Sequence, residues 1–169
     1  MSPGVQVLPD LLDHGCKVVF CGSAAGARSA AVGAYYAGPG NRFWPVLHRV
    51  GLTPRELAPH EFAEALDYRI GLTDLAKRES GADAELSAAA YDSAGFAAKM
   101  SRYAPSAVAF NGKAPARAYF GGAALDYGRQ ATRIGAAPVF VLPSTSGAAR
   151  RYWDQSHWWA LAEFVRSRP

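Results

Sequence analysis

Three short apolar runs constrain the fold of this chain more than any other feature, because each is followed by a loop of small or polar residues. The runs cover residues 17–22, 107–110 and 138–143. Their length and β-branched content are typical of strands that are buried on both faces. Helical segments lie between them, which predicts an α/β fold whose mostly parallel sheet is covered on both sides.

Between the apolar runs, hydrophobic spacing and helix-start signals predict the remaining elements. We expect helices over residues 42–50, 61–66, 92–103, 113–120 and 155–166, and a loop over residues 23–30. Thr53, Pro54 and Glu56 have the pattern of a further helix start, with Thr53 as the cap. Residues 70–75 fit either a strand or a loop that enters the site, and residues 79–90 fit a surface connection.

Length and composition favour one domain with an ordered core. The chain has 169 residues, of which 50% are hydrophobic and 19% are charged. We therefore expect a single domain over residues 1–169, with residues 1–15 at its periphery. The net charge of +4 is a weak indication of a polyanionic partner.

Several kinds of site and location are disfavoured by the sequence. Cys16 and Cys21 are too few for a disulfide framework or a Cys-rich zinc site, and the four histidines lack metal-like spacing, so we expect no metal. No apolar run approaches the ~20 residues that a membrane helix needs. The first residues show no leader pattern, so we expect a cytoplasmic protein without a membrane partner.

The loops after the apolar runs should lie together, because the carboxyl ends of parallel strands meet at one edge of a sheet. The loop at residues 144–146 offers short donors suited to a phosphate, or forms only a turn. Tyr35 and Tyr36 fit either a stacking platform for a planar base or the core. Lys113 is placed to meet an anion or to stay solvated, and Asp74 needs a function or a structural partner.

Six motifs follow one another along the chain. They are VVFCG at 18–22 leading to Gly26, GPGNRFW at 38–44, YRIGLT at 68–73, FNGK at 110–113, LPSTSG at 142–147 and HWW at 157–159. In this order they resemble the mismatch-specific uracil/thymine-DNA glycosylases over about residues 17–165. The resemblance implies the uracil-DNA glycosylase fold, a three-layer α/β/α sandwich. It also implies that a monomer turns a damaged base out of DNA and hydrolyses its N-glycosidic bond without a cofactor.

The same resemblance implies which residues form the site. Tyr36 corresponds to the family's stacking aromatic residue. The implied base pocket consists of Gly22, Ala24, Tyr36, Asn41 and Phe43. The implied contacts to the DNA backbone are Lys113, Ser144, Thr145 and Ser146, and the wedge that fills the hole left by the base consists of Gly147, Ala148 and the residues up to Arg150.

The first motif departs from the family pattern at the residue that positions the attacking water. Where the family has Gly-Ile-Asn-Pro-Gly, this chain has Gly22-Ser23-Ala24-Ala25-Gly26, and the methyl group of Ala24 cannot orient a water molecule. Our first candidate for a catalytic replacement is Asp74, whose carboxylate would accept an N–H of the base, orient water or balance charge on the sugar. The second candidate is the Ser23 hydroxyl, and a purely structural Asp74 is the alternative.

The wedge departs from the pattern too, because Ala148 is a poor plug and Arg150 and Arg151 follow closely enough to insert instead. We therefore expect both single- and double-stranded DNA as substrates. The leading function is excision of uracil, and also of hypoxanthine or xanthine, to leave an abasic site. The alternatives are a catalytically weak or inactive protein that binds lesions or abasic sites, and a protein that binds small nucleotides.

Overall fold

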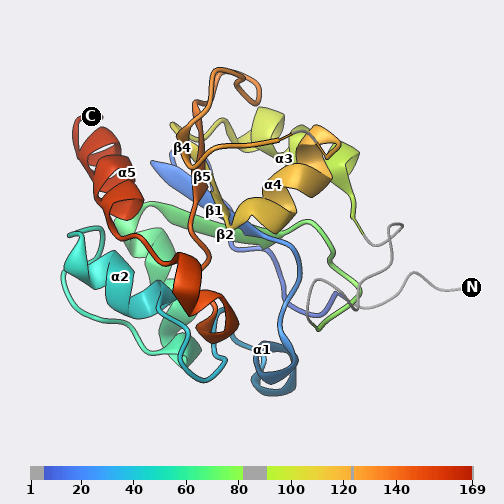
Figure 1. Ribbon diagram of the computed structural model, residues 1–169, viewed down its shortest axis with the longest axis vertical. Coiled ribbons are helices and arrows are strands. Elements are labelled where there is room, and N and C mark those ends of the chain that lie inside the picture. Colours follow the sequence, from blue (N-terminus) through green and yellow to red (C-terminus); the bar gives the residue numbers. More distant parts are fainter. Residues whose placement is uncertain (1–5, 82–90, 123, 169) are drawn as a thin grey trace, which may run out of the picture.

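A five-stranded sheet lies at the centre of the computed structural model, which describes residues 6–81, 91–122 and 124–168 (Figure 1). The strand order is β2-β1-β3-β5-β4. The parallel strands are β1 (Val18–Gly22), β2 (Ile70–Asp74), β3 (Val108–Asn111) and β5 (Val139–Leu142), and β4 (Gly128–Arg129) pairs antiparallel with β5. The predicted mostly parallel sheet is confirmed.

Helices cover both faces of the sheet, as the buried strands require (Figure 1). On one face, with Val18 and Phe20, lie α2 (Phe43–Arg49), the 3-10 helix η1 (Pro59–Tyr68) and α5 (Ser156–Arg166). On the other face, with Val19 and Cys21, lie α3 (Ser93–Tyr103) and α4 (Lys113–Phe120). Successive strand side chains alternate between these two cores, so the fold is the predicted three-layer sandwich.

One local prediction differs from the structure, and one pair of alternatives is decided by it. The loop expected at residues 23–30 contains the start of helix α1 (Ala27–Val32), whose alanine-rich sequence gives little periodic signal. Residues 70–75, left open between strand and loop, contain strand β2. Most of the surface connection expected at residues 79–90 lies outside the described residues.

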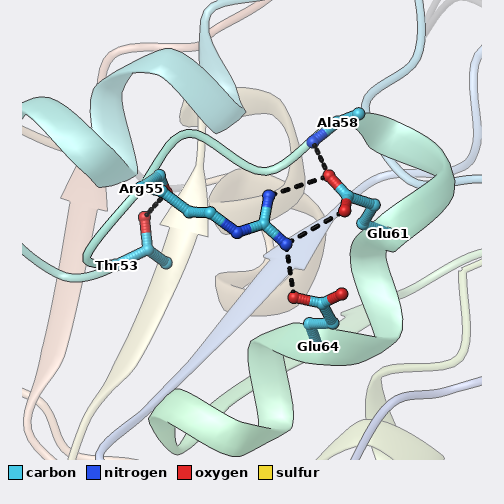
Figure 2. A network of polar contacts seen from close by, with 5 residues as sticks. All are labelled: Thr53, Arg55, Ala58, Glu61 and Glu64. Carbon is cyan, nitrogen blue, oxygen red and sulfur yellow. Dashed lines mark hydrogen bonds and ion pairs between the residues drawn. The ribbon is translucent and has the colours of Figure 1, made fainter.

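The predicted helix start at Thr53 is wrong, because the polar groups there are used differently (Figure 2). The Thr53 hydroxyl donates to the Arg55 carbonyl at 2.8 Å instead of capping a helix. The Arg55 guanidinium binds both carboxylate oxygens of Glu61, at 3.0 and 2.9 Å, and reaches Glu64 as well. Glu61 also accepts the Ala58 N–H, so this network fixes the start of η1 at the following proline.

Residues 6–15, the N-terminal segment that the structure describes, pack along β2, which differs from the peripheral position expected of residues 1–15. Leu11 and Leu72 exchange backbone hydrogen bonds of 2.9 and 2.8 Å, and the Val7 N–H donates to the Lys77 carbonyl at 2.7 Å. The Leu8 side chain is buried in the core. The segment supplies hydrogen-bond partners to a strand at the edge of the sheet, where backbone groups otherwise lack them.

None of the helices in the described part of the chain has the length and apolar character that a bilayer crossing requires.

Candidate functional site

A cavity of about 340 Å³ opens at the carboxyl ends of the parallel strands, the usual position of a ligand in an α/β sheet. Its walls come from residues 24–29, the loop at residues 35–41, Asp74 at the end of β2 and residues 146–148. Two of the elements that supply these residues are α1 and the 3-10 helix η4 (Gly147–Tyr152), and α1 lies at the lower edge of the molecule in Figure 1. Predicted site residues Ala24, Tyr36 and Asn41 line this cavity with Asp74.

Asp74 is the acidic group in the wall of this cavity. Its side chain is 6% exposed, and within the described ranges no hydrogen bond or ion pair reaches its carboxylate. Burial raises the pKa of Asp74 to about 6; the charge of Lys77 counteracts this rise and the charge of Asp10 reinforces it. A buried carboxylate without a protein partner is costly, and such groups mark functional sites.

Gly22 makes room for two polar groups of the site. It is the register partner of Asp74 across β1 and β2. A Cβ atom at Gly22 would lie 2.7 Å from Asp74 Oδ1 and 3.4 Å from the Tyr36 hydroxyl. Both polar atoms therefore converge on the space that the glycine leaves, and a side chain there would displace the carboxylate.

Tyr36 is held in an unusual conformation beside the cavity. Its φ angle is 54°, in the left-handed region that a bulky residue rarely adopts. The Ala37 N–H donates to Ser29 Oγ and the Trp44 indole N–H donates to the Tyr35 carbonyl, both at 2.9 Å, which fixes the chain on either side. The Tyr36 hydroxyl is buried and has no hydrogen-bond partner in the portion that the structure describes. Burial, and then the charge of Asp74, raise the pKa of Tyr36 well above its usual value.

Other residues predicted for the pocket lie behind its wall. Phe43 is fully buried and stacks on the Tyr36 ring with a centroid distance of 3.9 Å, so it supports the ring and does not line the cavity. Asn41, which does line the cavity, accepts the Phe43 N–H at its Oδ1 at 2.9 Å. Ser23 does not line the cavity, although its hydroxyl is buried and lacks a partner among the described residues.

Thr145, predicted to contact DNA, is a structural anchor in the fold. Its side chain is buried, its N–H donates to Asn111 Oδ1 at 3.0 Å, and its hydroxyl accepts from Asn111 Nδ2 at 2.9 Å. The Thr145 carbonyl accepts the Arg42 N–H at 2.9 Å. These internal bonds give Thr145 a structural role, and its contact with a phosphate stays a prediction. Sequence analysis missed the anchoring partner Asn111, although it lies in the FNGK motif at a strand end.

The wedge segment packs closely against the loop at residues 35–41. A Cβ atom at Gly147 would lie 2.8 Å from the Pro39 carbonyl oxygen, so only glycine allows this approach. Ser146 Oγ accepts the Ala148 N–H at 3.3 Å, and the Arg150 Nε donates to the Gly147 carbonyl at 3.3 Å. Ala148 and Arg150 are exposed, and Arg150 is folded back on its own segment.

The remaining predicted DNA contacts lie further from the cavity. Ser144 follows β5, and its Oγ accepts the Ser146 N–H at 3.2 Å. Lys113 begins α4, and its ammonium group lies 4.5 Å from the centre of the Tyr127 ring. In the described portion, no cluster of three or more His, Cys, Asp or Glu side chains is arranged to hold a metal ion.

Two comparisons with known proteins agree with this architecture. The model of a family described as Uracil DNA glycosylase superfamily matches residues 9–166. A solution NMR structure of a protein from Methanosarcina acetivorans, described as a candidate uracil DNA glycosylase, is 24% identical with a TM-score of 0.65. That similarity covers 94% of this chain and 96% of the other, and at this identity it shows a shared fold.

Proposed function

Because this chain belongs to the uracil DNA glycosylase superfamily, we propose that it excises uracil from DNA by hydrolysing the N-glycosidic bond. The observation that carries the proposal is the Asp74 carboxylate, which is buried without a protein partner in the described ranges and faces a cavity that Tyr36 also lines. Hypoxanthine and xanthine are further substrates that we propose, since each offers a ring N–H to a carboxylate.

The extruded base would enter the cavity against the Tyr36 ring. Phe43 covers one face of this ring and holds it in place, while Tyr36 still lines the cavity. Stacking of a base on an aromatic ring contributes about 1–3 kcal/mol. The rigid backbone around Tyr36 means that little ordering is needed when the base arrives.

Asp74 would act on the sugar and the water once the base is bound. The bond between C1′ and the base nitrogen breaks, and its electron pair leaves with the base. A water oxygen then bonds to C1′, and the ionised Asp74 carboxylate orients that water and accepts its proton. This role replaces the amide that the family has where this chain has Ala24.

DNA is the proposed partner, and its backbone would follow the loops around the cavity mouth. The donors that we propose for it are Ser146, which lines the cavity, and Ser144, Lys113 and Arg150, which lie further from it. Because Ala148 carries only a methyl group, we propose that the protein, acting as a monomer, depends little on the opposite strand. Matched single- and double-stranded substrates should then be processed at similar rates.

The experiment is a glycosylase assay on oligonucleotides that carry one uracil, hypoxanthine or xanthine, each single- and double-stranded. Alkali cleaves the abasic product, so strand scission reports excision, and an undamaged oligonucleotide is the control. Scission at uracil supports the proposal. Ala24 favours the competing function, a lesion-binding protein without chemistry, which predicts damage-specific DNA binding without scission. Salt-independent binding of free nucleotides, with no affinity for DNA, would contradict both functions.

A further inference from the structure

A second carboxylate, Asp10, is partly buried and lies on the N-terminal segment at the edge of the sheet. Its Oδ1 accepts from the Thr73 hydroxyl at 2.6 Å and lies 2.9 Å from Lys77 Nζ. Its Oδ2 lies 2.5 Å from Lys99 Nζ. Asp10 therefore connects the N-terminal segment with the end of β2, the loop that follows it, and α3.

Lys77 is the buried cation of this cluster and follows Asp74 by three residues in the sequence. Its side chain is 8% exposed, and its ammonium group contacts Asp10 and the Tyr35 hydroxyl, the latter at 3.2 Å. The Tyr35 hydroxyl in turn donates to the Pro9 carbonyl at 2.9 Å. No ion pair joins Lys77 to Asp74 in the described part of the chain, so both nearby acceptors of Lys77 lead back to the N-terminal segment.

The charges around Asp74 come from a small set of elements. Lys77 and Asp10 act on it most strongly after burial itself. The charge of Asp74 in turn helps to raise the pKa of the Cys21 thiol and of the Tyr35 and Tyr36 hydroxyls. Lys77 is thus the cation in this set whose position decides whether Asp74 is paired or available.

We propose that Asp10 is a positioning residue for the site: it holds the Lys77 ammonium group at the sheet edge, so that Asp74 stays free for the substrate. Removal of the Asp10 charge would leave Lys77 buried without a counterion, and Asp74 is the acceptor to which it would turn. A buried cation without a partner is costly enough to drive such a change. The inference rests on the proposed role of Asp74.

The test compares four variants with the wild type: Asp10→Asn, Lys77→Met, the double variant Asp10→Asn/Lys77→Met, and Lys99→Met. Lys99→Met is the matched control, because Lys99 pairs with the same carboxylate but is 31% exposed and lies on α3. The first readout is the ¹³C NMR titration of the Asp74 carboxyl group, identified as the signal that Asp74→Asn removes. The second readout is the pH profile of uracil excision in single turnover.

We expect Asp10→Asn to lower the titration midpoint of Asp74 by about one pH unit, the smaller end of the effect of a close opposite charge. Lys77→Met should raise the midpoint, the double variant should return it toward the wild type, and Lys99→Met should move it least. The excision profile should shift in the same order. A purely structural role for Asp10 predicts loss of stability without these opposite shifts.

An unchanged midpoint in Asp10→Asn, or a lower midpoint in Lys77→Met, would overturn the inference. If Asp10→Asn does not fold, Lys77→Met still decides, because it keeps the bonds of Asp10 to Thr73 and Lys99. Carboxyl shifts in the expected order in a protein that does not cut uracil DNA would refute the proposed function alone. Uracil excision with no such shifts would refute only the role of Asp10.

Discussion

Asp74 is buried and Asp10 is partly buried, both near the end of β2, and their surroundings are opposite. The Asp10 side chain is 18% exposed and meets Thr73, Lys77 and Lys99. Burial by itself raises the pKa of Asp10. The three partners together lower the pKa by more than burial raises it, so the pKa falls below its usual value. Asp74 has no partner among the described residues, and burial raises its pKa to about 6. The difference teaches that partners, more than burial, decide whether a buried acid stabilises the fold or serves the site.

The pleat of a single strand produces this contrast. Thr73 and Asp74 are neighbours in β2, and successive side chains of a strand point to opposite sides. Thr73 therefore reaches Asp10 on the side of the N-terminal segment. Asp74 points toward Gly22 and the cavity, where its carboxylate forms no hydrogen bond or ion pair with the described residues.

The largest expected effect is a loss of stability when the Asp10 carboxylate, which has three partners, is removed. Asp10→Asn should destabilise the protein by about 3 kcal/mol at pH 7, because it breaks the ion pairs of Asp10 with Lys77 and Lys99. Asp10 has a lowered pKa in the folded state, so its contribution is present above the unfolded value of 3.8 and is lost as pH falls through the folded value. Urea unfolding at pH 7 and at about pH 2, well below the unfolded value, measures this, and equal stability losses at both pH values would contradict the account.

Removal of the Asp74 carboxylate, which has no partner among the described residues, should change the stability in the opposite direction. Asp74→Asn should stabilise the protein by about 3 kcal/mol at pH 7, since the pKa rises from 3.8 to about 6 on folding. Below pH 3.8 both states are protonated, so the gain is absent there; it grows between pH 3.8 and about 6 and is complete above. Urea unfolding across this range is the measurement. Loss of stability at pH 7 would mean that Asp74 has a structural partner.

Two substitutions of Tyr36, which lines the cavity with Asp74, distinguish the role of its ring from the role of its hydroxyl. Tyr36→Ala should weaken capture of an extruded base by about 1–3 kcal/mol, whereas Tyr36→Phe keeps the ring on Phe43 and should preserve capture. Binding to an oligonucleotide with a non-hydrolysable 2′-fluoro uracil nucleotide measures this, with undamaged DNA as the control. Equal losses in both variants would show that the hydroxyl, not stacking, binds the base.

The smallest effect concerns a residue outside the comparison of the two acids. Lys113→Ala should weaken binding of damaged and undamaged DNA alike and lower the salt dependence of binding by about one charge. Its ammonium group already lies over the Tyr127 ring, which limits the loss. Fluorescence anisotropy at several salt concentrations checks this. A loss confined to uracil-containing DNA would place Lys113 in the base pocket instead.

Elements set by local pattern could be predicted from the sequence, and elements set by distant partners could not. The apolar runs predicted β1, β3 and β5 because strands buried on both faces have that composition. The N-terminal segment was misread, because its place depends on hydrogen bonds to Leu72 and Lys77. Thr145 was misread for the same reason, since its partner Asn111 is 34 residues away. In the candidate site, Asp74 stood out as an acid in an apolar strand, but its contrast with Asp10 required coordinates.

The most direct test of the account is the single-turnover rate of uracil excision against pH for the wild type and Asp74→Asn. We expect the wild-type rate to rise with pH through about 6, as Asp74 ionises, and then to level off. Asp74→Asn should be slower by about 10²–10⁴-fold and should lack this rise. Wild-type rates with an unchanged pH profile in Asp74→Asn would contradict the assignment of Asp74 as the catalytic group.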